Sequence, residues 1–237
     1  MSYPVVILAG GLGTRLGEIT RTIPKALVEV NGEPFLAHQL RLLRARGVRR
    51  VVMCISHLGE MIRDYAGDGS SFGLELQYSF DGPELLGTAG AIRKALPLLR
   101  ESFFVLYGDS YLPCDFEAVG ASFQKSEKLG LMTVFRNEGR WDTSNVEFAN
   151  GTILAYDKKV KTPRMEFIDY GLGVFQASGF RQLPADTPRD LAQFYQDLLS
   201  RGELAAYEIS ERFYEIGSVD GLNELSQYLT TQGNKTL

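Results

Sequence analysis

A short run of apolar residues at positions 4–9, PVVILA, constrains the fold more than any other feature of this sequence. It offers no polar side to water, which is typical of a strand buried on both faces of a parallel sheet. Similar strand-like runs follow at residues 51–56, 74–80 and 102–107. The segments between and after these runs carry helical spacing of apolar residues, at 35–43, 58–65, 88–99 and 116–129. This alternation predicts a mostly parallel sheet with right-handed crossovers.

After Gly130 the expected strands become shorter and are separated by turns. We expect strands at residues 132–135, 146–148, 153–156 and 172–175, with Asn150-Gly151 at the tip of a hairpin. A helix is expected over residues 187–200, with Thr187 as its N-cap and Pro188 at its first position, and a last helix over residues 222–229. No linker or repeat divides the chain, so we expect a single α/β domain over residues 1–237 with a mixed, mostly parallel sheet.

The charge balance, the cysteine and histidine pattern and the lengths of the apolar runs disfavour several classes of protein. The chain has 25 Lys and Arg against 29 Asp and Glu, a net charge of −4, which disfavours general nucleic-acid binding. Its two cysteines and two histidines form no metal-binding pattern, and buried thiols are the expected state. There is no run of 18 apolar residues and no signal-peptide pattern, so we expect no membrane association and a cytoplasmic location. The oligomeric state stays open.

The loop after the first expected strand concentrates groups that bind phosphate. Residues 8–16 read Leu-Ala-Gly-Gly-Leu-Gly-Thr-Arg-Leu, and Pro24-Lys25 follows shortly afterwards. Glycines let backbone N–H groups approach an anion, and Arg15 and Lys25 add cations. A Walker loop would need Gly-Lys-Ser/Thr, and a dinucleotide fingerprint would need glycine at position 16, where the chain has Leu16. A phosphate-binding turn of another kind is favoured over a plain strand-to-helix turn.

These residues resemble the opening signature of the sugar-1-phosphate nucleotidyltransferases, the nucleoside-diphosphate-sugar pyrophosphorylases. The shared positions are ten within seventeen residues: Gly10, Gly11, Gly13, Thr14, Arg15, Leu16, Thr20, Pro24, Lys25 and Ala26. Residues 86–91, LGTAGA, resemble the family's base-recognition loop. Residues 108–110, GDS, resemble its metal-binding strand end, and residues 213–218, FYEIGS, resemble a late motif that carries a second metal carboxylate.

The resemblance implies a Rossmann-like three-layer sandwich of the nucleotide-diphospho-sugar transferase type. It also implies an enzyme that uses Mg²⁺ to transfer a nucleoside monophosphate from a triphosphate to a sugar 1-phosphate, releasing pyrophosphate. The LGTAG loop is most similar to that of guanylyl-transferring members that act on mannose or manno-heptose 1-phosphate, which favours GTP; UTP, CTP and dTTP stay open. The alternatives are a non-catalytic regulatory subunit that binds nucleotide sugars and, less favoured, an oxidoreductase.

The resemblance also implies roles for individual residues. The nucleotide-binding set is Leu8, Ala9, Gly10, Gly11, Gly13, Thr14, Gly87 and Thr88. The catalytic set is Arg15, Lys25 and Asp109, and the metal ligands are Asp109 and Glu215. The sugar-phosphate set is Lys158, Lys159 and Asn145. Trp141 is expected either to line the sugar pocket or to be an aromatic residue of the core or the rim.

Two positions depart from the family pattern. Position 215 holds Glu where the family usually has Asp, and residues 157–160 read Asp-Lys-Lys-Val where the family has Glu-Lys-Pro. Counting back from Gly171 favours Lys159 over Lys158 as the residue that meets the sugar phosphate.

Overall fold

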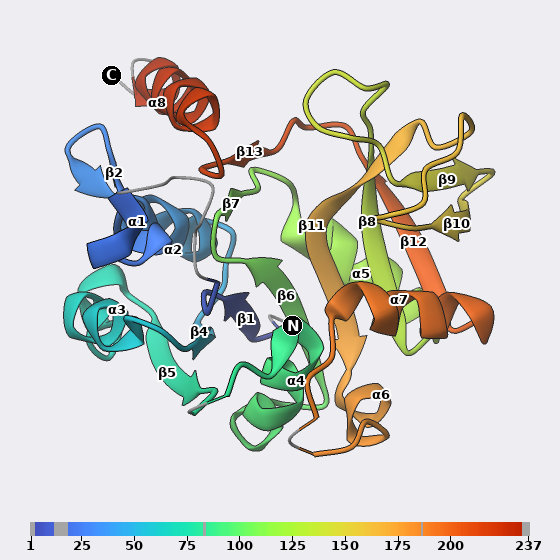
Figure 1. Cartoon of the computed structure of the whole chain (residues 1–237), viewed down its shortest axis with the longest axis horizontal. Coiled ribbons are helices and arrows are strands. Elements are labelled where there is room, and N and C mark those ends of the chain that lie inside the picture. The colour runs from blue at the N-terminus through green and yellow to red at the C-terminus, as the bar shows by residue number, and fades with distance from the viewer. Residues whose placement is uncertain (1–2, 12–18, 83, 186, 234–237) are drawn as a thin grey trace.

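The parallel half of the sheet contains four neighbouring strands. The computed structural model describes residues 3–11, 19–82, 84–185 and 187–233 (Figure 1). Strands β6 (Ser102–Tyr107), β1 (Val5–Leu8), β4 (Arg50–Ile55) and β5 (Glu75–Phe80) lie side by side in that order, all parallel. The predicted parallel sheet is confirmed, and the carboxyl ends of its parallel strands lie at one edge.

Helices cover both faces of this sheet. The side chains of each strand alternate between the two faces, so both faces carry apolar side chains that need a cover. Val5 and Ile7 face a core formed with α2 (Phe35–Ala45), α3 (Gly59–Ala66) and α5 (Phe116–Ser126). Val6 and Leu8 face a second core formed with α4 (Gly87–Ala95), α6 (Ala177–Arg181) and α7 (Leu191–Ser200). The result is the predicted three-layer α/β arrangement.

The second half of the chain extends the sheet with antiparallel strands. β11 (Phe167–Gln176) runs antiparallel to β6 and joins the two halves. β8 (Gly130–Arg136) pairs with β11 and with β12 (Leu204–Ile209), while β9 (Val146–Ala149) and β10 (Thr152–Tyr156) form the far edge. Asn150 and Gly151, both at positive φ, close the predicted hairpin between β9 and β10. β12 was not expected from the sequence.

Short elements complete the described chain. They are α1 (Ile19–Thr22), β2 (Glu29–Val30), β3 (Glu33–Pro34), β7 (Ser110–Tyr111), β13 (Tyr214–Glu215), α8 (Val219–Gly233) and the 3-10 turns Lys25–Leu27, Ser70–Phe72 and Leu96–Leu98. β13 pairs with β7, which follows β6 after a two-residue turn. A segment more than one hundred residues further along the chain is thereby brought to the carboxyl end of β6.

The start of α7 corrects a prediction. The helix begins at Leu191 with Asp190 as its N-cap, whose carboxylate accepts from the Ala192 amide at 2.8 Å, and not at Thr187 with Pro188. The preceding segment is held by α4 instead, because the Arg189 amide donates to the Leu86 carbonyl at 2.9 Å and the Arg189 carbonyl accepts from the Ala89 amide at 2.9 Å. Pairing between segments distant in sequence therefore overrides the local helix signal.

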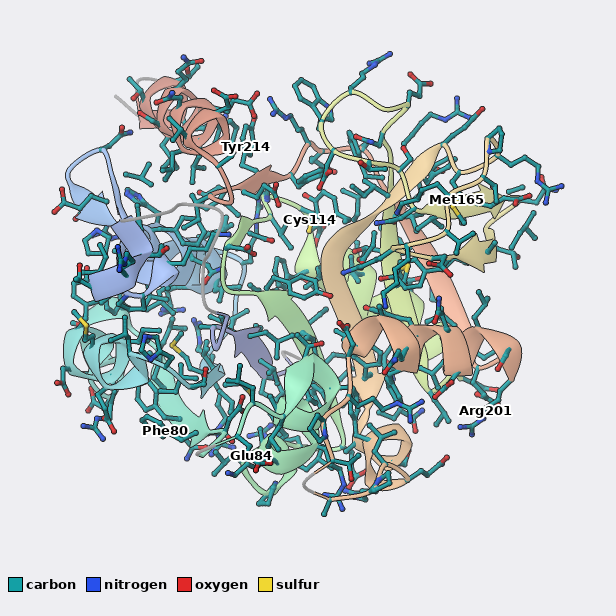
Figure 2. All side chains as sticks on the ribbon, in the orientation of Figure 1. Phe80, Glu84, Cys114, Met165, Arg201 and Tyr214 are labelled. Atoms are coloured by element: carbon teal, nitrogen blue, oxygen red, sulfur yellow. The ribbon has the colours of Figure 1, made fainter. Side chains whose placement is uncertain are left out.

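Both cysteines are free and buried, as expected. Figure 2 shows Cys114 in the interior and Arg201 at the periphery. Burial raises the pKa of the Cys114 thiol to about 12, which keeps it protonated at neutral pH. Within the described ranges, no helix combines the length and the apolar character needed to cross a bilayer. The cytoplasmic location stays a prediction.

Candidate active site

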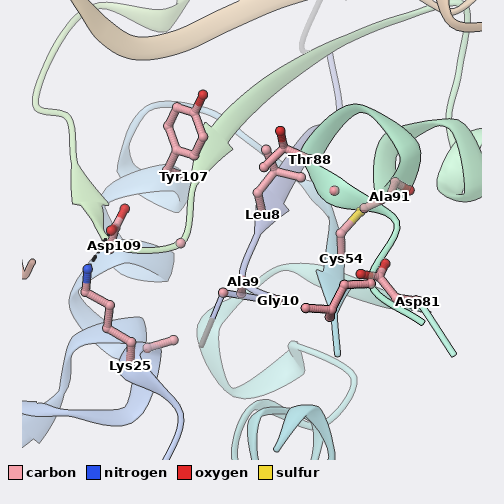
Figure 3. Close-up of a pocket in the computed structure, with 15 residues that line it drawn as sticks. Leu8, Ala9, Gly10, Lys25, Cys54, Asp81, Thr88, Ala91, Tyr107 and Asp109 are labelled. Atoms are coloured by element: carbon pink, nitrogen blue, oxygen red, sulfur yellow. Dashed lines mark hydrogen bonds and ion pairs between the residues drawn. The ribbon is translucent and has the colours of Figure 1, made fainter. Parts of the chain in front are cut away.

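A cavity of about 370 Å³ opens at the carboxyl ends of the parallel strands (Figure 3). Ligands of open α/β sheets bind at this edge, because the loops that leave the strands converge there. The wall combines residues from β1, β4 and β6, the residue after β5, the start of α4 and the 3-10 turn at Lys25. Its predicted members are Leu8, Ala9, Gly10, Gly11, Lys25, Gly87, Thr88 and Asp109, and its further members include Cys54, Asp81 and Tyr107.

The first glycines of the loop allow close approach of the backbone to neighbouring strands. The Gly10 carbonyl accepts from the Ser56 hydroxyl at 2.6 Å, and a Cβ on Gly10 would lie 2.9 Å from that oxygen. A Cβ on Gly11 would have no heavy atom of the described residues within 4 Å, and Gly11 lines the cavity. The predicted residues Gly13, Thr14 and Arg15 lie outside the described ranges.

The opposite wall begins at Gly87, which has a φ of +68°. A Cβ there would lie 2.6 Å from the Arg189 carbonyl oxygen, so this position requires glycine. The Thr88 hydroxyl accepts from the Leu191 amide at 2.7 Å and lies 3.3 Å from an Asp190 carboxylate oxygen. Thr88 therefore lines the cavity and also fixes the start of α7.

Lys25 and Asp109 form a short ion pair on the side of the cavity nearest β7. The Lys25 ammonium lies 2.6 Å from Asp109 Oδ2, and the two side chains are 13% and 25% exposed. Figure 3 shows the pair at the carboxyl end of β6. Asp109 therefore presents a carboxylate, and Lys25 a cation, to any ligand in this cavity.

A second cavity, of about 440 Å³, adjoins the first at Tyr107 and Asp109, which line both. Its other walls come from β11, the loops around residues 142–145 and 158–161, and β13. Asn145, Lys158 and Glu215, three predicted site residues, line it. Glu215 reaches it because β13 places this residue opposite Ser110, and the Ile216 amide donates to the Asp109 carbonyl at 2.9 Å.

Of the two adjacent lysines, Lys158 and Lys159, Lys158 lines the second cavity. Its ammonium lies 3.3 Å from the Tyr107 hydroxyl, 5.0 Å from the centre of that ring and 4.0 Å from Asp169 Oδ2. Burial opposes the charge, but the Tyr107 hydroxyl and the Asp169 carboxylate outweigh it and raise the pKa of Lys158 above its usual value. A permanent cation therefore stands beside Tyr107, whose own pKa burial raises to about 12.

The other two sugar-site predictions have different surroundings. Lys159 lines neither cavity; its amide donates to Asp157 Oδ1 at 2.7 Å within an exposed turn. Asn145 is 8% exposed, and its Oδ1 accepts from the Asp169 amide at 2.9 Å. Asn145 thereby holds the strand that carries Asp169 against the cavity.

Trp141 lies in a neighbouring hollow and not in the second cavity. Its ring packs on the Arg212 guanidinium at 3.4 Å, and 44% of the residue is exposed. This exposure excludes the core, one of the alternatives that the sequence left open.

The lining residues that were not anticipated from the sequence include Asp81, Tyr107 and Asp169. Asp81 follows β5 directly and Tyr107 ends β6, so their positions at strand ends were the available signal. Asp169 lies within β11, where nothing distinguishes it from an outward-facing polar residue until the partner strands are known.

Comparison with known proteins finds relatives along most of the chain. The chain is 27% identical over 212 residues to D-glycero-alpha-D-manno-heptose 1-phosphate guanylyltransferase of Campylobacter jejuni, covering 90% of this chain and 93% of that protein. It is 30% identical over 235 residues to UTP–glucose-1-phosphate uridylyltransferase of a Synechocystis species, covering 90% of this chain but only 60% of that protein.

Two solved structures have the same fold. HddC from Yersinia pseudotuberculosis, complexed with GMP-PN, superposes with a TM-score of 0.80 at 23% identity, covering 96% of this chain and 99% of that one. The inositol-1-phosphate CTP transferase from T. maritima gives a TM-score of 0.79 at 21% identity, covering 97% and 95%. The model of the nucleotidyl transferase family matches residues 4–232. The chain therefore belongs to the nucleotidyl transferase family.

Proposed function

We propose that this nucleotidyltransferase joins a nucleoside triphosphate to a sugar 1-phosphate and releases pyrophosphate. One observation carries the proposal: the two cavities meet at Asp109. Lys25 pairs with Asp109 and lines the first cavity, and Lys158 lines the second. The first cavity would hold the nucleotide and the second the sugar phosphate. Each substrate then brings its phosphate to the shared boundary.

The reaction needs positioning and neutralisation of charge more than covalent help from the protein. An oxygen of the sugar phosphate attacks the α-phosphorus, a new P–O bond forms, and the bond between the α-phosphorus and the bridging oxygen breaks as pyrophosphate leaves. Lys158 would orient the attacking phosphate, and Lys25 would neutralise charge that develops at the α-phosphoryl group. Backbone amides near Gly10 and Gly11 would face the triphosphate, with Arg15, Gly13 and Thr14 predicted to complete that site.

The donor set at the junction fits Mg²⁺. Asp109 and Glu215 both line the second cavity, and the described residues contain no cluster of three or more His, Cys, Asp or Glu side chains arranged to hold a metal. Mg²⁺ commonly takes one or two protein carboxylates and completes its shell with substrate phosphates and water. Asp109 and Glu215 would hold the ion, which when bound supplies positive charge to the nucleotide oxygens.

We propose guanine as the base, on the strength of Asp81. Its carboxylate lines the first cavity, where burial raises its pKa and a hydrogen bond from the Leu86 amide partly opposes that rise. An ionised carboxylate only accepts hydrogen bonds, and guanine offers two adjacent donors, N1–H and N2–H₂. Uracil and thymine offer a single N–H on the corresponding edge. The guanylyltransferase of C. jejuni, of which the chain covers 93%, supports the same choice.

The sugar is proposed only as an aldose 1-phosphate, because relatives differ in the sugar that they are named for. The chain is 39% identical over 125 residues, about half of each protein, to N-acetylmuramate alpha-1-phosphate uridylyltransferase of Neisseria meningitidis. A regulatory subunit without turnover is disfavoured, because Lys25, Asp109 and Lys158 are all present around one boundary.

A pyrophosphate-release assay tests the proposal. GTP, UTP, CTP and dTTP would each be paired with mannose, glucose, manno-heptose and N-acetylmuramate 1-phosphates in the presence of Mg²⁺. The expected result is release that requires both substrates and is fastest with GTP. Preference for another triphosphate would overturn the base assignment alone, and no release with any pair would favour the regulatory alternative.

A further inference from the structure

Gln39 is a buried polar side chain directly behind the turn that carries Asp109. It lies on α2 and is 1% exposed. Its Nε2 donates to the Tyr107 carbonyl at 3.1 Å and to the Ser110 carbonyl at 2.8 Å. These two carbonyls belong to the residues that flank Gly108 and Asp109. One side chain thus connects both ends of the turn.

The amide of Gln39 is only half satisfied. Gln39 Oε1 is buried and has no hydrogen-bond partner in the part of the chain that the structure describes. Leaving a buried amide oxygen unpaired costs free energy, whereas an apolar residue of similar size would not incur this cost. Flipping the amide would not help, because both partners are carbonyls that require a donor. The buried neighbours of Gln39 on the same helix, Leu36, Leu40 and Leu43, are apolar.

The same turn is fixed from two other directions by backbone bonds. The Gly108 amide donates to the Leu8 carbonyl of β1 at 2.9 Å, and the Ile216 amide donates to the Asp109 carbonyl at 2.9 Å. A Cβ on Gly108 would lie 2.9 Å from Ala9 Cα, so the turn sits hard against the first loop. Gln39 supplies the support from the helix side.

We propose that Gln39 is a positioning residue that fixes residues 107–110 so that Asp109 faces Lys25 and the shared boundary of the two cavities. The inference rests on the proposed function, since it assigns Gln39 a part in the work of Asp109. The unpaired Oε1 is then the structural cost of placing two N–H donors behind a catalytic turn. Residues that orient the ligands of a metal typically change metal affinity or activity by about 10- to 100-fold when they are replaced.

The test compares Gln39→Met with Gln176→Met. Methionine fills a similar volume without donors or a buried acceptor. Gln176 is a matched control, because its Nε2 also donates to a backbone carbonyl, that of Lys128 at 3.2 Å. It pairs with Ser102 at the start of β6, the end of the strand away from the turn.

For Gln39→Met we expect kcat to fall by about tenfold or more and the Mg²⁺ concentration for half-maximal activity to rise by a similar factor. The melting temperature should change little, because Met removes the unpaired Oε1 but also leaves the Tyr107 and Ser110 carbonyls without this donor. In the metal-free protein, amide hydrogen exchange of residues 108–111 should become at least about fivefold faster. Gln176→Met should leave kcat, the Mg²⁺ dependence and this exchange unchanged.

Wild-type kinetics and wild-type exchange in a folded Gln39→Met protein would overturn the inference. If this variant does not fold, Gln39→Asn serves the same purpose, since it keeps the amide but is too short to reach both carbonyls. Asp109→Asn separates this inference from the proposed function. If Asp109→Asn retains full activity, the role of Asp109 is refuted, whereas an inactive Asp109→Asn beside a fully active Gln39→Met refutes the positioning role alone.

Discussion

The ion pair between Lys25 and Asp109 places opposite charges 2.6 Å apart at the boundary of two cavities. In the absence of ligand the two groups neutralise each other. A nucleotide that brings phosphate to this boundary offers Lys25 a second anion, and the cation can then serve the reacting centre. We propose this change of partner as the role of the lysine that follows Pro24.

Lys25→Ala should therefore reduce kcat by about 10²- to 10³-fold, the size expected for loss of one donor to developing charge, with a smaller loss of nucleotide affinity. Steady-state kinetics and nucleotide titration measure the two effects separately. An unchanged kcat would remove Lys25 from the reacting phosphorus.

The two adjacent lysines should behave differently. Lys158→Ala should raise the KM for the sugar phosphate by about 10- to 100-fold, the equivalent of one hydrogen bond to a charged group. Lys159→Ala should change it by less than about twofold, because Lys159 lines neither cavity. The opposite ranking, measured at saturating nucleotide, would restore the assignment that counting back from Gly171 favoured.

Asp81→Asn should weaken the preference for GTP and also stabilise the protein at pH 7. Burial raises the pKa of Asp81, so the folded protein holds this proton more tightly than the unfolded chain does. The stability that Asp81 contributes is thus present at low pH and is lost as the pH rises through its pKa in the folded state. The gain in melting temperature from Asn should shrink as the pH falls.

Asp64→Asn, at an exposed carboxylate on α3, is the control for the Asp81 variant. It should alter neither the preference among triphosphates nor the melting temperature at pH 7. An unchanged ratio of kcat/KM for GTP over UTP in Asp81→Asn would show that this carboxylate does not read the base.

At the level of elements, the wall of the nucleotide cavity depends on the contact between the start of α4 and the segment before α7. Gly87 allows this contact because its φ is +68° and the Arg189 carbonyl lies where a Cβ would be. The same contact displaces the start of α7 from Thr187 to Leu191. One tertiary interaction thus explains both a predicted site residue and a wrong helix boundary.

Gly87→Ala should destabilise the protein by more than Gly67→Ala does. Both glycines have positive φ, +68° and +56°, but no described atom lies within 4 Å of the position that a Cβ on Gly67 would take. Gly67→Ala should cost about 1–3 kcal/mol in the free energy of unfolding from backbone strain alone, and Gly87→Ala should add the steric clash to such strain. Denaturant unfolding of both variants measures the difference, and equal losses would contradict the contact.

Other elements show what sequence alone could predict. The buried parallel strands were readable because a strand covered on both faces must be apolar throughout, as β1 and β6 are. β12, with the sequence LAAYEI, has no such pattern, since four of its residues are partly or fully exposed. Its strand state follows from pairing with β8, a partner more than seventy residues earlier in the chain.

For the whole molecule, several residues that the sequence assigned to one site line a common cavity, whereas the orientation of individual side chains could not be predicted. Motif resemblance grouped Lys25, Asp109 and Glu215, and the structure brings Asp109 and Glu215 to one cavity through the pairing of β13 with β7. Chain spacing could not distinguish Lys158 from Lys159, because neighbouring residues in a turn face different directions. Gln39 carries no motif, and its position behind the turn follows only from helix packing.

The net charge of −4 makes the local arrangement of cations decisive for two anionic substrates. Lys25 and Lys158 lie on the two sides of Asp109 and Tyr107, the residues that line both cavities. The proposed reaction requires that the nucleoside monophosphate, which carries the α-phosphorus, is transferred across this boundary.

Label transfer from GTP tests this requirement most directly. With Mg²⁺, a sugar 1-phosphate and GTP labelled on the α-phosphate, the label should be recovered in a nucleotide sugar. GTP labelled on the γ-phosphate should give labelled pyrophosphate in equal amount, and neither product should form without the sugar phosphate. Transfer of the γ-label to the sugar, or release of orthophosphate without any sugar phosphate, would contradict the account.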